Sequence, residues 1–144
     1  MPLKGMTGLG GAVINIFGGA VPNPKATGGD DIIYPGDGYI YHIFTSSGDF
    51  TVLSEAITTD YFIVAGGGGG GMKGTACCGG GGAGGMLDLD SVALIASTSY
   101  PVVVGAGGTG SSGAYGTPTN GPGEDGGDSS FNGSTAVGGG FGGG

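Results

Sequence analysis

The chain has 144 residues, 41 of them glycine, and its 11 acidic and three basic side chains give a formal net charge of −8 at pH 7. This length suits one domain. Three basic residues exclude a nucleic-acid interface or a polybasic membrane-surface helix, both of which need a cationic face. A hydrophobic share of 38% argues against charge-driven disorder, and the glycines lack the strict three-residue repeat of collagen.

Residues 1–29 form an apolar, glycine-punctuated segment that ends with a Pro-Asn-Pro sequence. Two prolines without helical periodicity predict an extended arm. The apolar stretch is broken by glycine and too short to span a bilayer, so we expect no membrane span. Exposed apolar clusters usually have a partner, which favours an anchor over an unattached terminus or a signal peptide. The expected partner-anchoring residues are Leu9, Val13, Ile14, Ile16 and Phe17.

Residues 30–65 have the composition of β-structure. The run 39–44 is rich in tyrosine and isoleucine and follows a Pro-Gly-Asp-Gly turn signal. Residues 49–53 come after Ser-Ser-Gly, so the two runs are predicted to form a hairpin. Residues 60–65 are continuously apolar, which predicts a strand covered on both faces. His42 lies inside the first run, where a structural role is expected rather than a catalytic one.

From residue 66 onward the glycines gather in blocks, which lie at 66–71, 79–82, 84–85, 138–140 and 142–144. A flexible linker separates folded units, whereas these blocks alternate with short strand-like pieces. We therefore expect polyglycine II helices, which have about three residues per turn and no internal hydrogen bonds. Without side chains, such backbones approach closely and pair laterally. One of the intervening pieces, 100–104, contains Pro101, which predicts an edge strand or a strand start there.

The inventory of reactive groups is small, and we expect no enzymatic activity, no cofactor and no metal site. Cys77 and Cys78 are adjacent, and adjacent Cα atoms are about 3.8 Å apart where a disulfide needs about 5.5 Å. A zinc site from both cysteines and His42 would require long-range folding. The acidic stretch 123–128 predicts a solvated turn, with a calcium site as the alternative.

Residues 110–120 form a polar loop rich in serine, glycine and threonine. A tyrosine in such surroundings is typical of adaptable recognition loops; the alternative is a loop tip without function. The candidate recognition residues are Tyr115, Thr117 and Asn120.

An ordered series of motifs resembles the glycine-rich domain of tailed-phage virion proteins, particularly those of marine phages. The motifs are FTSSGDFTV at 44–52, YFIVAGGG at 61–68, GGGGAGG at 79–85, YPVVVGAGG at 100–108, GGDSSF at 126–131 and AVGGG at 136–140. The resemblance covers roughly residues 26–144. It implies a β-sandwich-like element joined to glycine-rich segments and displayed on a virion. Related modules at tail-fibre tips are bundles of polyglycine II helices that touch host receptors through their loops.

We therefore expect an all-β protein with an extended arm at 1–29 and a small β-sandwich-like, glycine-rich domain at 30–144. The expected function is that of a non-enzymatic virion structural protein, a capsid decoration or knob anchored by the arm. Its expected partners are other virion proteins and copies of itself, because a protein with a small core is often stabilised by association. A trimer would suit the bundling of polyglycine helices. The alternatives are a tail-fibre or tail-tip adhesin that contacts a host receptor, and a secreted glycine-rich wall or matrix protein.

Overall fold

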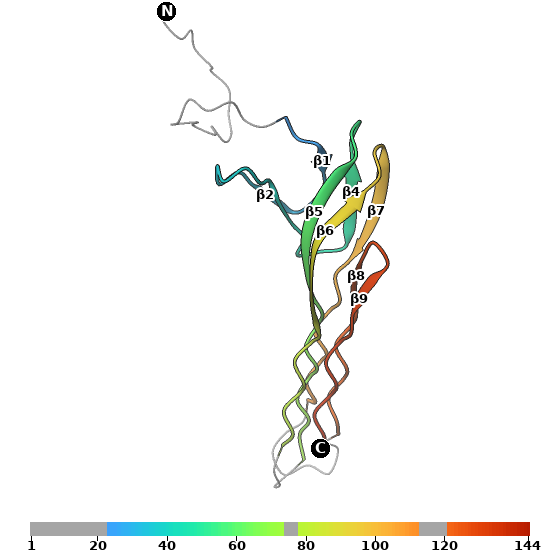
Figure 1. Ribbon diagram of the computed structural model, residues 1–144. Helices are drawn as coiled ribbons and strands as arrows, with labels where there is room; N and C mark the ends of the chain where they lie inside the picture. The colour runs from blue at the N-terminus through green and yellow to red at the C-terminus, as the bar shows by residue number, and fades with distance from the viewer. Residues whose placement is uncertain (1–22, 74–77, 113–120) are drawn as a thin grey trace, which may run out of the picture.

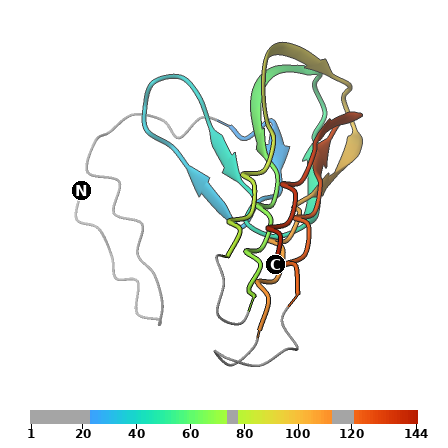
Figure 2. The ribbon, with the colours of Figure 1, turned by 90° about the horizontal axis from the view of Figure 1, so that it is seen from below.

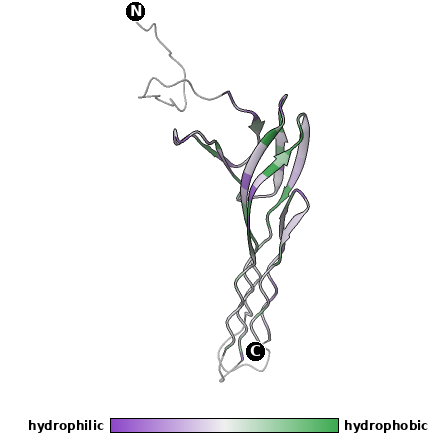
Figure 3. Ribbon diagram, in the orientation of Figure 1, coloured by the Kyte–Doolittle hydropathy of each residue, from purple (hydrophilic) through white to green (hydrophobic). Residues whose placement is uncertain are grey.

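The computed structural model describes residues 23–73, 78–112 and 121–144. These residues form nine β-strands and no helix, which confirms the all-β prediction. The molecule is elongated, with the strands at one end and extended glycine-rich segments at the other (Figure 1). Strongly hydrophobic residues concentrate in the strand part, whereas the glycine-rich part is close to neutral (Figure 3).

The larger sheet has five antiparallel strands in the order β1-β4-β7-β8-β9. Its strands are β1 (Ala26–Thr27), β4 (Gly48–Val52), β7 (Thr98–Val103), β8 (Ser129–Phe131) and β9 (Ser134–Ala136). A second layer consists of β5 (Ile57–Val64) and β6 (Met86–Leu94), which pair antiparallel and pack on β8 and β9. The two layers make the small sandwich-like arrangement that was expected.

Aromatic side chains fill the space between these layers. The ring of Phe131 meets the rings of Phe50 and Tyr61 edge-on, with centroid distances of 5.8 and 5.0 Å. Such edge-to-face pairs are favourable because the positive ring edge faces the negative ring face. Val52 and Leu94 are the most completely buried side chains around this cluster. The core is therefore thin and depends on a few large residues.

A third pair of strands, β2 (Asp31–Ile33) and β3 (Tyr41–Ile43), forms a separate two-stranded hairpin. The predicted hairpin between residues 39–44 and 49–53 is therefore wrong. The carboxylate of Asp30 accepts hydrogen bonds from the N–H groups of Thr45 and Ser46, which holds the chain in a turn after β3. The following strand β4 pairs with β1 and β7 instead, where Phe50 becomes buried.

Two further expectations about strands need correction. The apolar run 60–65 is not covered on both faces, since Phe62 and Val64 are 56% and 54% exposed; it lies in a two-stranded layer with one packed face. The strand β7 is not an edge strand of its sheet. Pro101 is tolerated because β8 begins to pair only at Val102, so the missing N–H faces no ladder partner on that side.

Replacing Phe131 by alanine should lower the free energy of unfolding by about 3 to 5 kcal/mol, because a cavity replaces the ring at the centre of the aromatic cluster. Phe141→Ala is a matched control, since that ring is 52% exposed and its loss should change stability by less than about 1 kcal/mol. Urea unfolding of both variants measures the difference. Equal effects would contradict the central position of Phe131 in the core.

Candidate functional site

Five glycine-rich segments continue directly from the strands and run side by side (Figures 1 and 2). We call them segments A to E: A is 65–73, B is 78–85, C is 104–112, D is 121–128 and E is 137–144. A follows β5, B precedes β6, C follows β7, D precedes β8 and E follows β9. Together they form the bundle.

The hydrogen bonds of segment A repeat every three residues. The N–H groups of Ala65, Gly68 and Gly71 donate to carbonyls in segment B, at Gly85, Gly82 and Gly79. The next residue in each case, Gly66, Gly69 or Met72, donates to segment D, at Gly127, Glu124 and Gly121. A β-strand alternates with a period of two, so a period of three identifies polyglycine II geometry. This confirms the prediction of polyglycine II segments.

Segment A lies at the centre of the bundle. Its carbonyls at Gly66 and Gly69 accept from segment E, and those at Gly67 and Gly70 accept from segment C. Outside this centre, B bonds to E, E bonds to D and D bonds to C. Each of the four outer segments is therefore tied both to A and to at least one outer neighbour.

Glycine is required inside the bundle because the backbones touch. A Cβ atom built on Gly81 would lie 2.0 Å from the carbonyl oxygen of Gly68, and one on Gly126 would lie 2.1 Å from that of Gly66. No real Cβ fits at such distances, whereas a Cα–H group can point at the oxygen and make a weak hydrogen bond. All described glycines with positive φ lie outside the five segments, so close approach, and not an unusual backbone angle, is what selects glycine here.

Two aspartates in segment D close one edge of the bundle. The carboxylate of Asp128 accepts the N–H of Gly138, and that of Asp125 accepts the N–H of Phe141, each at 2.8 Å. The two aspartates are three residues apart, and so are the two amides that they accept. At this edge, carboxylates therefore take the place that carbonyls of a further backbone segment would otherwise have. Residues 123–128 were predicted to form a solvated turn; they belong instead to a polyglycine II segment, and these two carboxylates are occupied by backbone amides.

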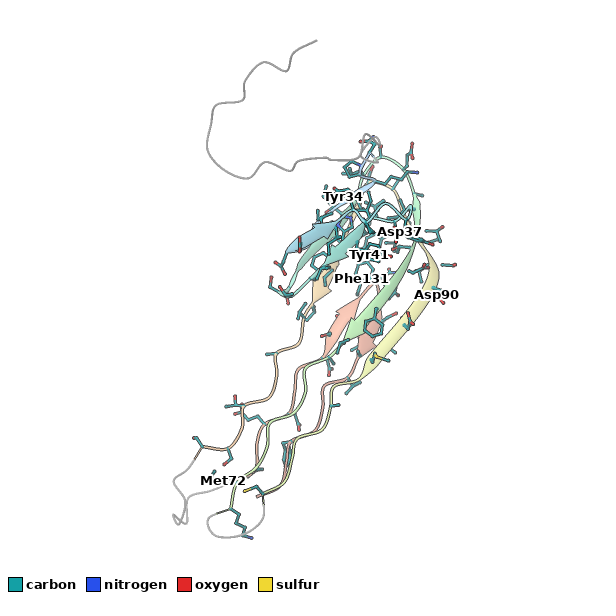
Figure 4. The ribbon with its side chains drawn as sticks, turned by 90° about the vertical axis from the view of Figure 1, so that its left-hand side faces the viewer. Tyr34, Asp37, Tyr41, Met72, Asp90 and Phe131 are labelled. Atoms are coloured by element: carbon teal, nitrogen blue, oxygen red, sulfur yellow. The ribbon has the colours of Figure 1, made fainter. Side chains whose placement is uncertain are left out.

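The described residues next to the connections 74–77 and 113–120 lie at the far end of the bundle, away from the strands. Met72 donates to the carbonyl of Gly121, and Gly79 donates to that of Gly143, so segments A, B, D and E end together. Met72 lies at the opposite end of the molecule from Tyr34 and Tyr41 (Figure 4).

The site residues expected from the sequence lie outside the described residues. They are the anchoring residues Leu9, Val13, Ile14, Ile16 and Phe17 and the recognition residues Tyr115, Thr117 and Asn120. Both sets stay predictions.

The β2–β3 hairpin carries an exposed apolar surface that the sequence interpretation missed. Its large side chains are 37% to 60% exposed, and the hairpin pairs with no other described strand. A usable signal was present in the sequence, since isoleucine and tyrosine flank both sides of the Pro-Gly-Asp-Gly turn. We call these exposed side chains together the hairpin patch; they are Ile32, Ile33, Tyr34, Tyr39, Tyr41 and Ile43. In the β2–β3 register, Ile33, Tyr41 and Ile43 share one face of the hairpin and Ile32 lies on the other.

Two carboxylates hold the hairpin in place. The N–H of Thr45, at 2.7 Å, and donors of Ser46 stabilise the charged form of Asp30 and lower the pKa of this carboxyl to about 2. At the tip, the N–H of Tyr39 lowers the pKa of Asp37 in the same way. The hydroxyl of Tyr41 also donates to Asp37, and this bond raises the pKa of Tyr41. A lone hairpin is marginally stable in water, so these bonds matter for presenting the hairpin patch.

His42 has a structural environment, as expected. Its Nδ1 lies 2.7 Å from the carbonyl oxygen of Gly28, and its ring packs at right angles against Phe50 with centroids 5.0 Å apart. Cys78 lies at the start of segment B, at the far end of the bundle from the strands. Among the described residues, no three metal-ligating side chains come together, and no helix could cross a membrane.

Alanine at Gly81 should destabilise the protein by about 3 kcal/mol, because its methyl group would overlap the backbone of segment A. Alanine at the adjacent Gly80 should change stability by less than about 1 kcal/mol, since a Cβ there meets nothing within 4 Å. Thermal unfolding followed by circular dichroism compares the two variants. Similar melting temperatures would show that the bundle is not packed as described.

The carboxylate of Asp30 should make stability depend on acid pH. Because the pKa of Asp30 in the folded protein is below the ordinary aspartate value of 3.8, the stabilisation is present above that value and is lost as the pH falls toward about 2. Asp30→Asn should therefore melt below the wild type at pH 7, with a gap that narrows between about pH 4 and pH 2. Asp31→Asn removes the same charge from the next residue and serves as the control. A gap that stays constant over this range would refute the role given to Asp30.

Comparison with known proteins agrees with this architecture. A family model described as a glycine-rich domain matches residues 45–144. The matched region begins just before β4 and includes all five segments of the bundle. No curated protein and no solved structure matches the chain. The chain therefore belongs to the glycine-rich domain family.

Proposed function

We propose that the protein is a non-enzymatic structural protein of a phage particle, displayed on the particle surface. The observation that carries the proposal is the difference between the two ends of the molecule. One end presents the hairpin patch beside the first described residues of the chain, and the other is the far end of the bundle (Figures 1 and 4). The reason for proposing a phage particle is the order of the glycine-rich motifs, which resembles that of tailed-phage virion proteins.

The strand end has the chemistry of an attachment base. Exposed apolar patches on soluble domains usually mark interaction sites, and the hairpin patch holds six large apolar side chains. The expected anchoring arm at residues 1–29 includes β1, which belongs to the same end of the molecule. We propose that the arm and the hairpin patch together contact a neighbouring virion protein.

The bundle end has the character of a projecting tip. Segment A is bonded to four neighbouring segments, which makes the bundle a rigid support, and rigid supports with loops at their ends are a common way to present function. The acidic net charge of −8 suits exposure to solvent and does not suit contact with nucleic acid.

A tail-fibre or tail-tip adhesin is the second candidate. It is favoured by one observation, namely that the residues flanking the connections 74–77 and 113–120 meet at the far end of the bundle. In this case the recognition residues expected at Tyr115, Thr117 and Asn120 would contact a host receptor. A secreted wall or matrix protein is the remaining alternative, in which the chain is absent from particles.

Immunogold labelling of purified particles, with antibodies raised against the folded domain, tests the proposal. Gold on intact particles is the expected result, and its distribution separates the two candidates: label over the head supports a decoration, and label at the tail end supports an adhesin. Particles that carry no label, and whose denatured proteins include no trace of the chain by mass spectrometry, would overturn both.

Substitution of Ile33 by aspartate should reduce the amount of the protein on particles by about tenfold, since burial of such a side chain contributes about 1.5 to 3 kcal/mol. Ile95→Asp is the matched control, because Ile95 is 69% exposed and lies outside the hairpin patch. Quantitative immunoblots of purified particles compare the two variants. Equal incorporation of both would show that the hairpin patch is not part of the attachment base.

A further inference from the structure

Segment A has one side on which no described segment is hydrogen-bonded to it. A helix with about three residues per turn directs its N–H groups in three directions. Two of these directions lead to segments B and D, as described above. The third belongs to Gly67 and Gly70, which are exposed and whose N–H groups have no acceptor among the described residues.

The contacts between segments define the shape of this side. Around A the bonded outer segments follow each other in the order B, E, D, C, and no hydrogen bond among the described residues joins B to C. Segments B, A and C therefore lie in one row, with E and D as a second layer on one side of it (Figure 2 looks along the bundle). On the other side of the row no segment within residues 23–73, 78–112 and 121–144 is hydrogen-bonded to segment A, and we call this side the open face.

Glycines on the open face are not required by packing within the chain. A Cβ on Gly67 or Gly70 would lie 3.5 or 3.4 Å from the nearest carbonyl oxygen, and on Gly107 or Gly110 3.8 or 3.7 Å. These are ordinary contact distances, so alanine would fit. Ordering a glycine carries a higher entropic penalty than ordering an alanine, and the closer approach of another backbone would explain why glycine is present.

An apolar patch continues the open face into the strand part. Phe62, Val64 and Met86 are 56%, 54% and 63% exposed, and Val64 lies directly opposite Met86 in the β5–β6 pair. These side chains point away from the sandwich core, because the intervening Ile63 is buried in it. The core side of β5 and β6 faces β8 and β9, which adjoin segments D and E, so the patch lies on the side away from these segments and shares that side with the open face.

We infer that the open face packs against the open face of a second copy of this chain, about a two-fold axis. Segments A, B and C contain no acidic residue, whereas Glu124, Asp125 and Asp128 are all in segment D of the other layer. The bundle part of this face thus carries no acidic side chain, and in the strand part Asp88 lies opposite Phe62 in the β5–β6 pair. The face offers donors in the N–H groups of Gly67 and Gly70, and the carbonyls of Ala65, Gly68 and Gly71 accept no backbone hydrogen bond from the described residues. Donors of one copy can therefore pair with carbonyl acceptors of the other, so the face is complementary to itself.

The contact would extend the packing already present inside the chain. The row B-A-C binds the layer E-D through backbone hydrogen bonds at 2.7 to 3.1 Å, and a second copy would repeat this arrangement on the open face. Phe62, Val64 and Met86 would add apolar burial, which backbone contact alone does not provide.

Sedimentation equilibrium of the full chain, over a wide range of concentrations, tests the inference. The wild type should approach twice the 13.5 kDa mass of one chain. The double variant Gly67→Ala/Gly70→Ala should fold with an unchanged circular dichroism spectrum and sediment as a monomer. Gly140→Ala/Gly143→Ala is the matched control in segment E, where a Cβ also has room, and it should remain a dimer.

Three results would overturn the inference: a wild type that is monomeric throughout, a trimer, or a dimer that survives Gly67→Ala/Gly70→Ala. Hydrogen exchange of the wild type adds a residue-level readout, in which the amides of Gly67 and Gly70 should exchange more slowly as the concentration rises. Exchange independent of concentration at both amides would count against the inference. These outcomes do not depend on whether the protein is found on a phage particle.

Discussion

Direct contact between backbones is the constraint on which the bundle depends. The carbonyl oxygen of Gly68 lies where the Cβ of any other residue at position 81 would be, and comparable contacts recur along the segments. Ordering so many glycines has a large entropic cost, which is offset only if their N–H groups find hydrogen-bond acceptors. Segment A meets this condition by bonding to four neighbours at once. Short side chains or charged residues inside the bundle would keep the backbones apart.

The strand part supplies the register that glycines lack. Identical glycines give no side-chain pattern by which one alignment could be preferred over another, but each segment continues a strand whose partner is fixed. Val64 pairs with Met86 in the β5–β6 ladder, and the next bond along the chain runs from the N–H of Ala65 to the carbonyl of Gly85. The aromatic cluster around Phe131 holds the strands together, and the register of the strands in turn sets the register of the glycine-rich segments. A small core therefore determines the alignment of the whole bundle.

Much of this architecture could be predicted from the sequence. The glycine blocks between strand-like pieces indicated polyglycine II helices, and the three-residue hydrogen-bond repeat of segment A confirms them. The pairing of β3 with β2 was missed although isoleucine and tyrosine flank both sides of the Pro-Gly-Asp-Gly turn. The sequence does not show that Asp30 holds the turn after β3, because its partner Thr45 is 15 residues away. The role of Asp125 and Asp128 was missed because their partners, Gly138 and Phe141, become neighbours only after folding. The anchoring and recognition residues lie outside the described residues, so the structure does not test them.

The most direct test of the account is a measurement of hydrogen-bond scalar couplings by NMR for two amides of segment A that are two residues apart. In the bundle, the amide of Gly66 should couple to the carbonyl of Gly127 and the amide of Gly68 to that of Gly82, in two different segments. Detection of both couplings would exclude the two-residue repeat of a β-strand and support the three-residue repeat. Couplings from both amides to one and the same segment would indicate a β-ladder, in which amides two residues apart point to the same neighbour, and rapidly exchanging amides without couplings would indicate a flexible linker; either result would contradict the polyglycine bundle.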